Sequence, residues 1–334
     1  MTARLGSLCS GYGGLDMAVA EVLDVEQRWF ADVEPAAIAT HAHHWPGLVN
    51  LGDITTAAWS SAEPVDIMTA GYPCQPFSLA GQRMGADDSR HLWPHVAAAV
   101  RHLRPGLVIL ENVAGHRSKG FGAVLADLAA LGYRTAWGSV RASDVGAPHA
   151  RERVFVAATD ARHGCVPEWA RCARGKVGQR QAVGEDVARC GQVPSGGLTL
   201  LPTPAARDYR SGRSHLIGQN ARPLNEIAVM RLTGDGDPWR EFGPAVRHWE
   251  RLSGRLAPAP AVQGARGARV LNPALPEWMM GLPLGFVTAV PGLTRTDQIK
   301  LLGNGVCPPQ GAWAVRALLS ILVPRRCPSC TLTH

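Results

Sequence analysis

The chain has 334 residues, of which 46% are hydrophobic and 18% charged, and its formal net charge is +7. This length predicts one large core with a smaller second lobe. No run approaches the roughly 20 apolar residues that a membrane-spanning helix needs, and the first residues lack the apolar core of a signal peptide. We therefore expect a cytoplasmic protein that does not enter the membrane.

The eight cysteines predict neither disulfides nor a metal site. The single CxxC spacing joins Cys327 to Cys330, and no second pair lies at the spacing of a zinc site. Reduced thiols fit an intracellular compartment.

The positive charge is confined to one third of the chain. Residues 160–270 contain seventeen Lys and Arg against ten Asp and Glu, so their excess equals the net charge of the whole chain. Nearly all of these basic residues are arginines, whose planar fork suits phosphates and guanine edges. A GC-rich genome explains arginine over lysine, but it does not explain the confinement. We expect a polyanion to dock on this segment.

Short apolar runs alternate with helical patterns up to residue 158, which predicts an α/β fold with a doubly wound, mostly parallel sheet. The predicted strands are 5–9, 28–31, 65–70, 107–110, 134–140 and 154–158, and the predicted helices are 15–23, 36–43, 92–102 and 122–131. Ligands of such sheets bind at the carboxyl ends of the strands.

The chain divides into three segments at residues 159 and 270. Residues 1–159 carry the sheet, and residues 160–270, rich in Gly, Pro and Arg, predict a smaller, loop-rich lobe. Regular patterns return at 272–286 and in a helix at 311–323, so residues 271–334 are expected to complete the first domain.

A glycine-rich turn, Ser10-Gly11-Tyr12-Gly13-Gly14, follows the first predicted strand. Glu34 lies about 20 positions further, where doubly wound folds place a carboxylate on ribose hydroxyls. Asp53 and Ile54 supply an acidic and an apolar contact for an adenine. Together these residues predict an adenosyl cofactor, and the missing third glycine of GxGxxG argues against a dinucleotide.

Residues 71–78 read Gly-Tyr-Pro-Cys-Gln-Pro-Phe-Ser, which places Cys74 between two prolines in a stiff, irregular loop. A thiol held rigidly after a buried strand suits a nucleophile. For an isolated Pro-Cys pair, a structural cysteine is the simpler interpretation, so the other motifs must decide between the two.

Two further motifs are ambiguous alone. Glu111 ends a buried apolar run, so its pKa should rise, as suits an acid, but it could instead cap the following turn. Arg151 and Arg153, at i and i+2 of an extended segment, should point the same way and could grip an anion or carbonyl. A solvated surface pair is the alternative.

Taken in order, these motifs resemble the C5-cytosine DNA methyltransferase family. The match covers residues 4–158 and 272–322 and includes Leu302-Gly303-Asn304-Gly305-Val306. The intervening gap coincides with the basic segment. The resemblance implies a catalytic and cofactor-binding domain at 1–159, a target-recognition domain at 160–270 and a return segment at 271–334.

The resemblance also implies the catalytic roles. The Cys74 thiolate would add to C6 of a flipped-out cytosine, and Glu111 would donate at N3. Arg153, together with Arg151, would hold the O2 edge. Gln75 and Asn112 would support the substrate and its loop, which would close over the base between residues 75 and 91.

The implied cofactor is S-adenosylmethionine, leaving S-adenosylhomocysteine as product. Its implied contacts are Cys9, Ser10, Gly11, Tyr12, Gly13, Gly14, Glu34, Asp53, Ile54, Pro73, Leu92, Asn304 and Val306. The implied partner is double-stranded DNA, with a cognate restriction endonuclease left open, and we expect a monomer.

Three positions depart from the family pattern: Cys9 replaces a phenylalanine, His149 a glutamine, and Gly305 a serine or alanine. None of them removes a catalytic group. The alternatives are a tRNA cytosine methyltransferase, a catalytically silent DNA-binding paralogue and a dinucleotide oxidoreductase. The long basic insert favours DNA over tRNA.

Overall fold

The computed structural model describes residues 2–73, 92–163, 198–210, 223–230, 232, 238–265 and 267–322. Cys74, Gln75, the loop expected to close at 75–91 and the pair Cys327 and Cys330 lie outside the described residues.

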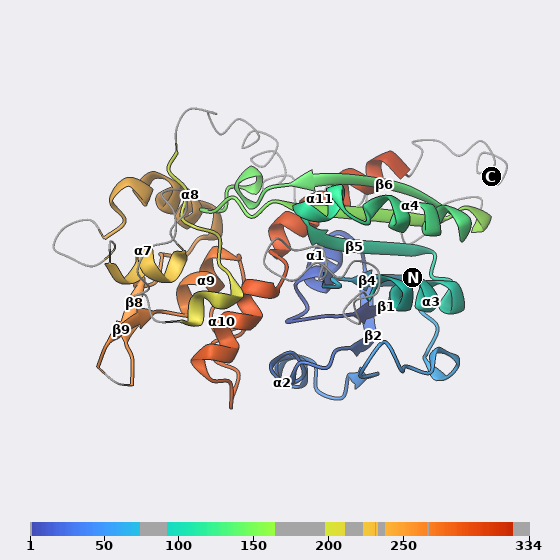
Figure 1. The fold of residues 1–334 in the computed structure, drawn as a ribbon, viewed down its shortest axis with the longest axis horizontal. Helices are drawn as coiled ribbons and strands as arrows, with labels where there is room; N and C mark the ends of the chain where they lie inside the picture. Colours follow the sequence, from blue (N-terminus) through green and yellow to red (C-terminus); the bar gives the residue numbers. More distant parts are fainter. Residues whose placement is uncertain are drawn as a thin grey trace.

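A seven-stranded sheet forms the larger lobe, in the strand order β3-β2-β1-β4-β5-β7-β6 (Figure 1). Its strands are β1 (Ala3–Leu8), β2 (Val25–Ala31), β3 (Val49–Asn50), β4 (Ile67–Ala70), β5 (Leu107–Val113), β6 (Tyr133–Val140) and β7 (Arg153–Asp160). Neighbouring strands are parallel except that β7 runs antiparallel to β5 and β6. The predicted mostly parallel sheet is confirmed.

Helices cover both faces of the sheet because successive strand residues point to opposite sides. Leu107 and Ile109 face one hydrophobic cluster, and Val108 and Leu110 face another. The first cluster includes α1 (Gly14–Val22) and α11 (Pro308–Leu322), and the second includes α3 (Trp93–Leu103) and α4 (Phe121–Ala130). The fold is therefore doubly wound. No helix of the described part of the chain is long and apolar enough to cross a membrane.

A second lobe lies beside the carboxyl ends of the parallel strands (Figure 1). Its elements are η6 (Ala206–Tyr209), α7 (Leu224–Met230), α8 (Gly243–Ser253), the hairpin of β8 (Ala261–Gln263) and β9 (Arg269–Leu271), α9 (Ala274–Met279) and α10 (Arg295–Asn304). Within the described part of this lobe, apolar positions at helical spacing form helices. Helix α8, for example, buries Val246 and Trp249 on one face.

The hydrophobic core of the second lobe does not respect the boundary expected at residue 270. One cluster joins Ile227 and Trp249 to Trp278 and Leu302, so α9 and α10 pack with the helices that precede them. At Gly303, an added Cβ would lie 2.2 Å from the backbone nitrogen of Ala206, which requires glycine there. Of residues 271–322, α11 and the preceding Val306 pack on the sheet.

Several elements differ from their predicted limits for tertiary reasons. Strand β5 continues through Glu111 to Val113 because β7 pairs with it along that length. The pattern at 272–286 becomes the short helix α9. Helix α10 begins at a capping box formed by Thr294 and Asp297. Helix α2 runs over Pro35–His44.

Asp160, at the end of β7, is buried and binds two guanidiniums. Its carboxylate lies 2.7 Å from the nitrogen of Arg104, which follows α3, and 2.9 Å from that of Arg162. Burial alone would raise the pKa of Asp160, but hydrogen bonds from Arg162 and Arg104 outweigh it and lower the pKa to about 2. The ionised carboxylate therefore stabilises the fold above its unfolded pKa.

We expect Asp160→Asn to lower the free energy of unfolding by about 2 kcal/mol at pH 7. Because the native pKa is depressed, the advantage of the wild type should disappear as the pH falls from about 4 to about 2. Urea unfolding at several pH values measures it. An equal difference at pH 7 and pH 2 would show that the ion pairs are not its source.

Candidate active site

The turn between β1 and α1 is shaped for close approach of a ligand. Gly11 and Gly13 have φ of 55° and 80°, the left-handed region that favours glycine. The carboxylate of Asp32, at the end of β2, accepts the N–H of Gly11 and that of Glu34, each at 2.9 Å. Asp32 is a brace that the sequence interpretation missed, because it considered only the nearby Glu34.

The surroundings of this turn fit an adenosyl cofactor. The hydroxyl of Ser10 is buried and has no partner among the described residues. The side chains of Glu34 and Asp53 are exposed at the ends of their strands, and Ile54 is buried beside them. Burial, with the charges of Asp32 and Asp53, raises the pKa of the Cys9 thiol to about 12, so that it stays neutral.

Tyr12 joins this turn to the C-terminal motif. Its side chain is fully buried, and its hydroxyl donates to the carbonyl of Val306 at 2.5 Å. Gly14 and Gly305 pack on its ring so closely that a Cβ at Gly305 would lie 1.9 Å from it. The side chain of Tyr12 therefore braces the site from behind, whereas the sequence interpretation placed it among the cofactor contacts.

The other expected cofactor contacts lie around the same edge of the sheet. Pro73 and Asn304 are exposed, Leu92 is half-buried, and Val306 is buried. Pro73 ends the described segment that leads from β4 to the cysteine loop.

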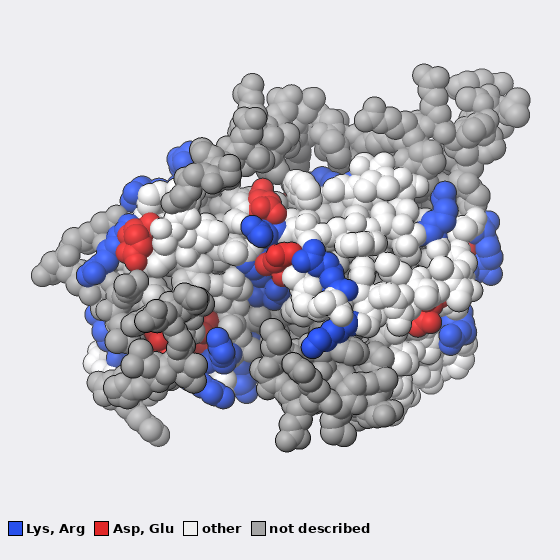
Figure 2. Space-filling model, turned by 45° about the horizontal axis from the view of Figure 1, so that its top comes forward, with Lys and Arg blue, Asp and Glu red and all other residues white. Residues whose placement is uncertain are grey.

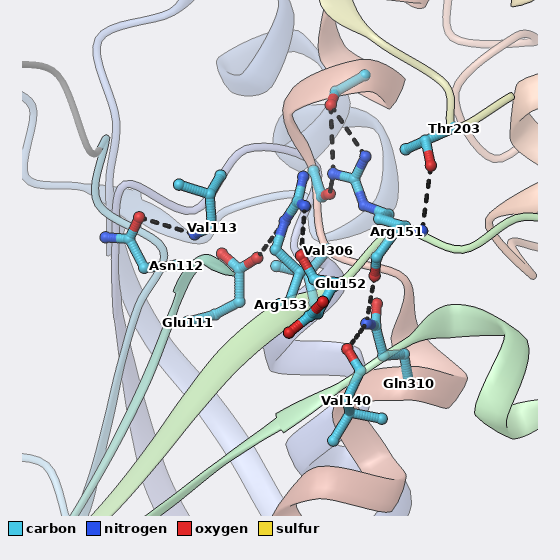
Figure 3. A network of polar contacts seen from close by, with 12 residues as sticks. Glu111, Asn112, Val113, Val140, Arg151, Glu152, Arg153, Thr203, Val306 and Gln310 are labelled. Carbon is cyan, nitrogen blue, oxygen red and sulfur yellow. Dashed lines mark hydrogen bonds and ion pairs between the residues drawn. The ribbon is translucent and has the colours of Figure 1, made fainter. Parts of the chain in front are cut away.

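Glu111 lies near the end of β5 in an almost dry environment. Its side chain is 9% exposed, and its Oε1 lies 2.9 Å from Nε of Arg153, the first residue of β7 (Figure 3). Burial raises the pKa of Glu111, and the charges of Arg153 and Arg151 oppose this rise without cancelling it. A carboxyl so balanced can hold or release a proton.

The strand end is also tied to the start of the cysteine loop. A Cβ built at Gly71 would lie 3.9 Å from Oε2 of Glu111, so the free carboxyl oxygen faces this segment. Asn112 donates from its side chain to the carbonyl of Tyr72 at 3.1 Å. Two residues before Cys74, the chain is therefore fixed against the Glu111 strand.

Arg151 has a different role from Arg153. Its backbone φ is 30°, so the segment is not extended there, and the expectation that the two side chains point the same way is wrong. Its guanidinium donates to the carbonyls of Pro204, Gly303 and Gly305. Burial and the charge of Arg153 lower the pKa of Arg151 to about 10, which leaves it charged at neutral pH.

Three neighbours, of which His149 and Gln310 are buried, hold the Arg151 segment. The hydroxyl of Thr203 accepts the Arg151 N–H at 3.1 Å, and Gln310 donates to the carbonyls of Val140 and Arg151 at 2.7 and 2.8 Å (Figure 3). Nε2 of His149 lies 3.0 Å from the carbonyl of Met279, and because a carbonyl only accepts, Nε2 carries the hydrogen. Neither Thr203 nor Gln310 was among the candidate site residues drawn from the sequence.

We expect Arg151→Lys to destabilise the protein by about 3 kcal/mol or more, because one ammonium cannot reach all three carbonyls and leaves buried acceptors unpaired. Thermal and urea unfolding measure the loss. Arg141→Lys, at an exposed position of the same sheet edge, is the matched control and should unfold like the wild type. Equal stability of both variants would refute the bracing role.

Comparison with known proteins shows which family this chain resembles. Residues 3–168 match the model of the C-5 cytosine-specific DNA methylase family. A type II methyltransferase of Neisseria lactamica, M.NlaIV, is 36% identical over 138 residues, which cover 38% of this chain and 33% of that protein. A protein of Escherichia phage P1 named DNA N-6-adenine-methyltransferase is 38% identical over 141 residues, covering 37% of this chain and 19% of that protein.

These alignments span only a fifth to a third of the two relatives. The fold extends further, because the S. pombe Dnmt2 methyltransferase structure superposes with a TM-score of 0.61 over 96% of this chain and 99% of its own, at 17% identity. The matched residues 3–168 include the glycine turn, Glu111 and both arginines. Through them, the chain belongs to the C-5 cytosine-specific DNA methylase family.

Proposed function

We propose that the protein methylates C5 of a cytosine in double-stranded DNA, using S-adenosylmethionine. The observation that carries the proposal is the buried Glu111–Arg153 pair, which faces the segment leading to Cys74 in a chain of this family. Such a pair has no evident use in a protein that merely binds DNA, because burying a carboxylate and a guanidinium is costly.

The chemistry requires the ring to be activated before C5 can attack. The Cys74 thiolate adds to C6, and Glu111 donates a proton or hydrogen bond at N3, which stabilises the electron pair displaced onto the ring. The raised pKa of Glu111 favours its protonated form for this step. After methyl transfer, loss of the C5 proton and elimination of the thiolate restore the ring.

The two arginines divide their work. Arg153 orients Glu111 and is 15% exposed at its side chain, so it can also reach the O2 edge of the base. Arg151, with its guanidinium on three carbonyls, positions the strand and the turn at 303–305. It is a positioning residue, and the base-edge role implied for it belongs to Arg153.

The cofactor supplies an electrophilic methyl group carried on a sulfonium. For its binding we propose Glu34 on the ribose hydroxyls, Asp53 and Ile54 on the adenine, and the backbone of residues 10–14 against the amino-acid moiety. Asn304, exposed beside the buried Val306, would close the same pocket from the C-terminal side.

The proposed partner is duplex DNA, from which the target base must be flipped. The relatives named type II methyltransferases support a role in restriction and modification, with a cognate endonuclease as a further partner. The likeness to a Dnmt2 structure, at 17% identity, concerns the fold alone. RNA therefore remains the competing substrate to be tested.

Methyl transfer from labelled S-adenosylmethionine should be detected on duplex DNA and not on tRNA. Cys74→Ala should abolish it, and Glu111→Gln should lower it by a factor of about a hundred or more, since the neutral amide cannot deliver a proton. Methyl transfer to tRNA alone would show that the substrate is RNA and not DNA. Full activity of Cys74→Ala would refute the mechanism.

Tyr12→Phe should weaken cofactor binding several-fold, because the turn at 10–14 loses its hydrogen bond to Val306. Tyr133→Phe is the matched control, because its buried hydroxyl donates to Pro105 at 2.7 Å, away from the site. Calorimetric titration of both variants with S-adenosylhomocysteine measures the difference. Equal affinities would show that the Tyr12 hydroxyl does not shape the pocket.

A further inference from the structure

Strands β5 and β6 end, and strand β7 begins, around the Glu111–Arg153 pair. Arg153 is the register partner of Val113 on one side and of Val140 on the other. The chain leaves β5 into η3 (Ala114–Ser118) and leaves β6 at Arg141. Residues from both exits therefore flank the catalytic pair at the same edge of the sheet.

Basic side chains occupy both exits. We call Arg117, Lys119 and Arg141 the basic edge. The side chains of Arg117 and Arg141 are 44% and 62% exposed, and no acidic residue occurs between Glu111 and Asp127. Figure 2 shows basic side chains, with acidic ones among them, across the middle of the molecule, where the two lobes meet.

Glu152, between the two site arginines, links the exits. Its carboxylate lies 2.9 Å from Arg117 and 3.8 Å from Arg141. Surface pairs of this kind contribute roughly 0–1 kcal/mol, so stability does not explain them. Glu152 instead holds two guanidinium forks side by side, with N–H groups left over for another acceptor. The second acid of the edge, Asp144, accepts the backbone N–H of Arg141 at 2.7 Å.

From this arrangement we propose that the basic edge grips phosphates of the DNA backbone next to the flipped cytosine. The proposal deepens the proposed function and rests on it. Arginine forks match phosphate oxygens in a bidentate way, and such contacts fix register without reading sequence. The basic edge lies outside the basic segment 160–270, so it adds a second, sequence-independent contact on the catalytic side of the site.

Salt dependence of binding to a mixed-sequence 30-base-pair duplex tests the proposal, because each lost phosphate contact lowers the slope of log K against log salt by about 0.9. We expect that fall for Arg117→Gln and for Arg141→Gln, and about twice it for the double variant. Fluorescence anisotropy of a labelled duplex gives the slopes without requiring catalysis.

Arg134→Gln is the matched control. Arg134 lies near the start of β6, and Arg141 directly follows the end of the same strand. Both are exposed, but Arg134 lies at the opposite end of the strand from the proposed phosphate contact. The control should keep the wild-type slope. Equal slopes for Arg134→Gln and Arg141→Gln would overturn the proposal.

The outcomes separate the two proposals. Unchanged slopes for Arg117→Gln and Arg141→Gln, with intact methyl transfer to DNA, overturn the basic edge and leave the proposed function standing. Reduced slopes without any methyl transfer support the basic edge and refute the activity. Tighter binding of a tRNA than of the duplex would overturn the choice of DNA as the partner.

Discussion

The buried guanidinium of Arg151 is the interaction on which the arrangement of the site depends. It donates hydrogen bonds to three backbone carbonyls from two segments far apart in sequence, at Pro204 and at 303–305. A charge in this dry position is tolerated because these backbone oxygens accept its hydrogen bonds. The second lobe, the turn at 303–305 and the residues that lead into β7 are thereby fixed to one another.

The proposed catalytic pair, Glu111 and Arg153, is held by an ion pair instead. At Glu111, burial raises the pKa of the carboxyl, the charge of Arg153 lowers it, and the net shift is upward. At the same sheet edge, Arg151 is therefore bound by backbone carbonyls, whereas Arg153 is bound by the carboxylate of Glu111. This difference separates Arg151, which positions the backbone, from Arg153, which we propose faces the substrate.

The two lobes meet where the parallel strands end, so each lobe contributes residues to the same site. Thr203 and Pro204 hold Arg151 from the second lobe, and His149 holds Met279 from the first. The Tyr12 hydroxyl joins the glycine turn at 10–14 to Val306 in the same region. A change in how the second lobe sits would therefore act directly on the site.

The sequence alone determined the doubly wound sheet, six of its strands and the order of the motifs, because alternating apolar runs and punctuating glycines are local signals. It also indicated Glu111 and Arg153. Only the tertiary structure separated Arg151 from Arg153, turned Tyr12 into a brace and gave α9 and α10 to the second lobe. Those outcomes depend on backbone carbonyls and packing partners that lie from 29 to 294 residues away, which no local pattern encodes.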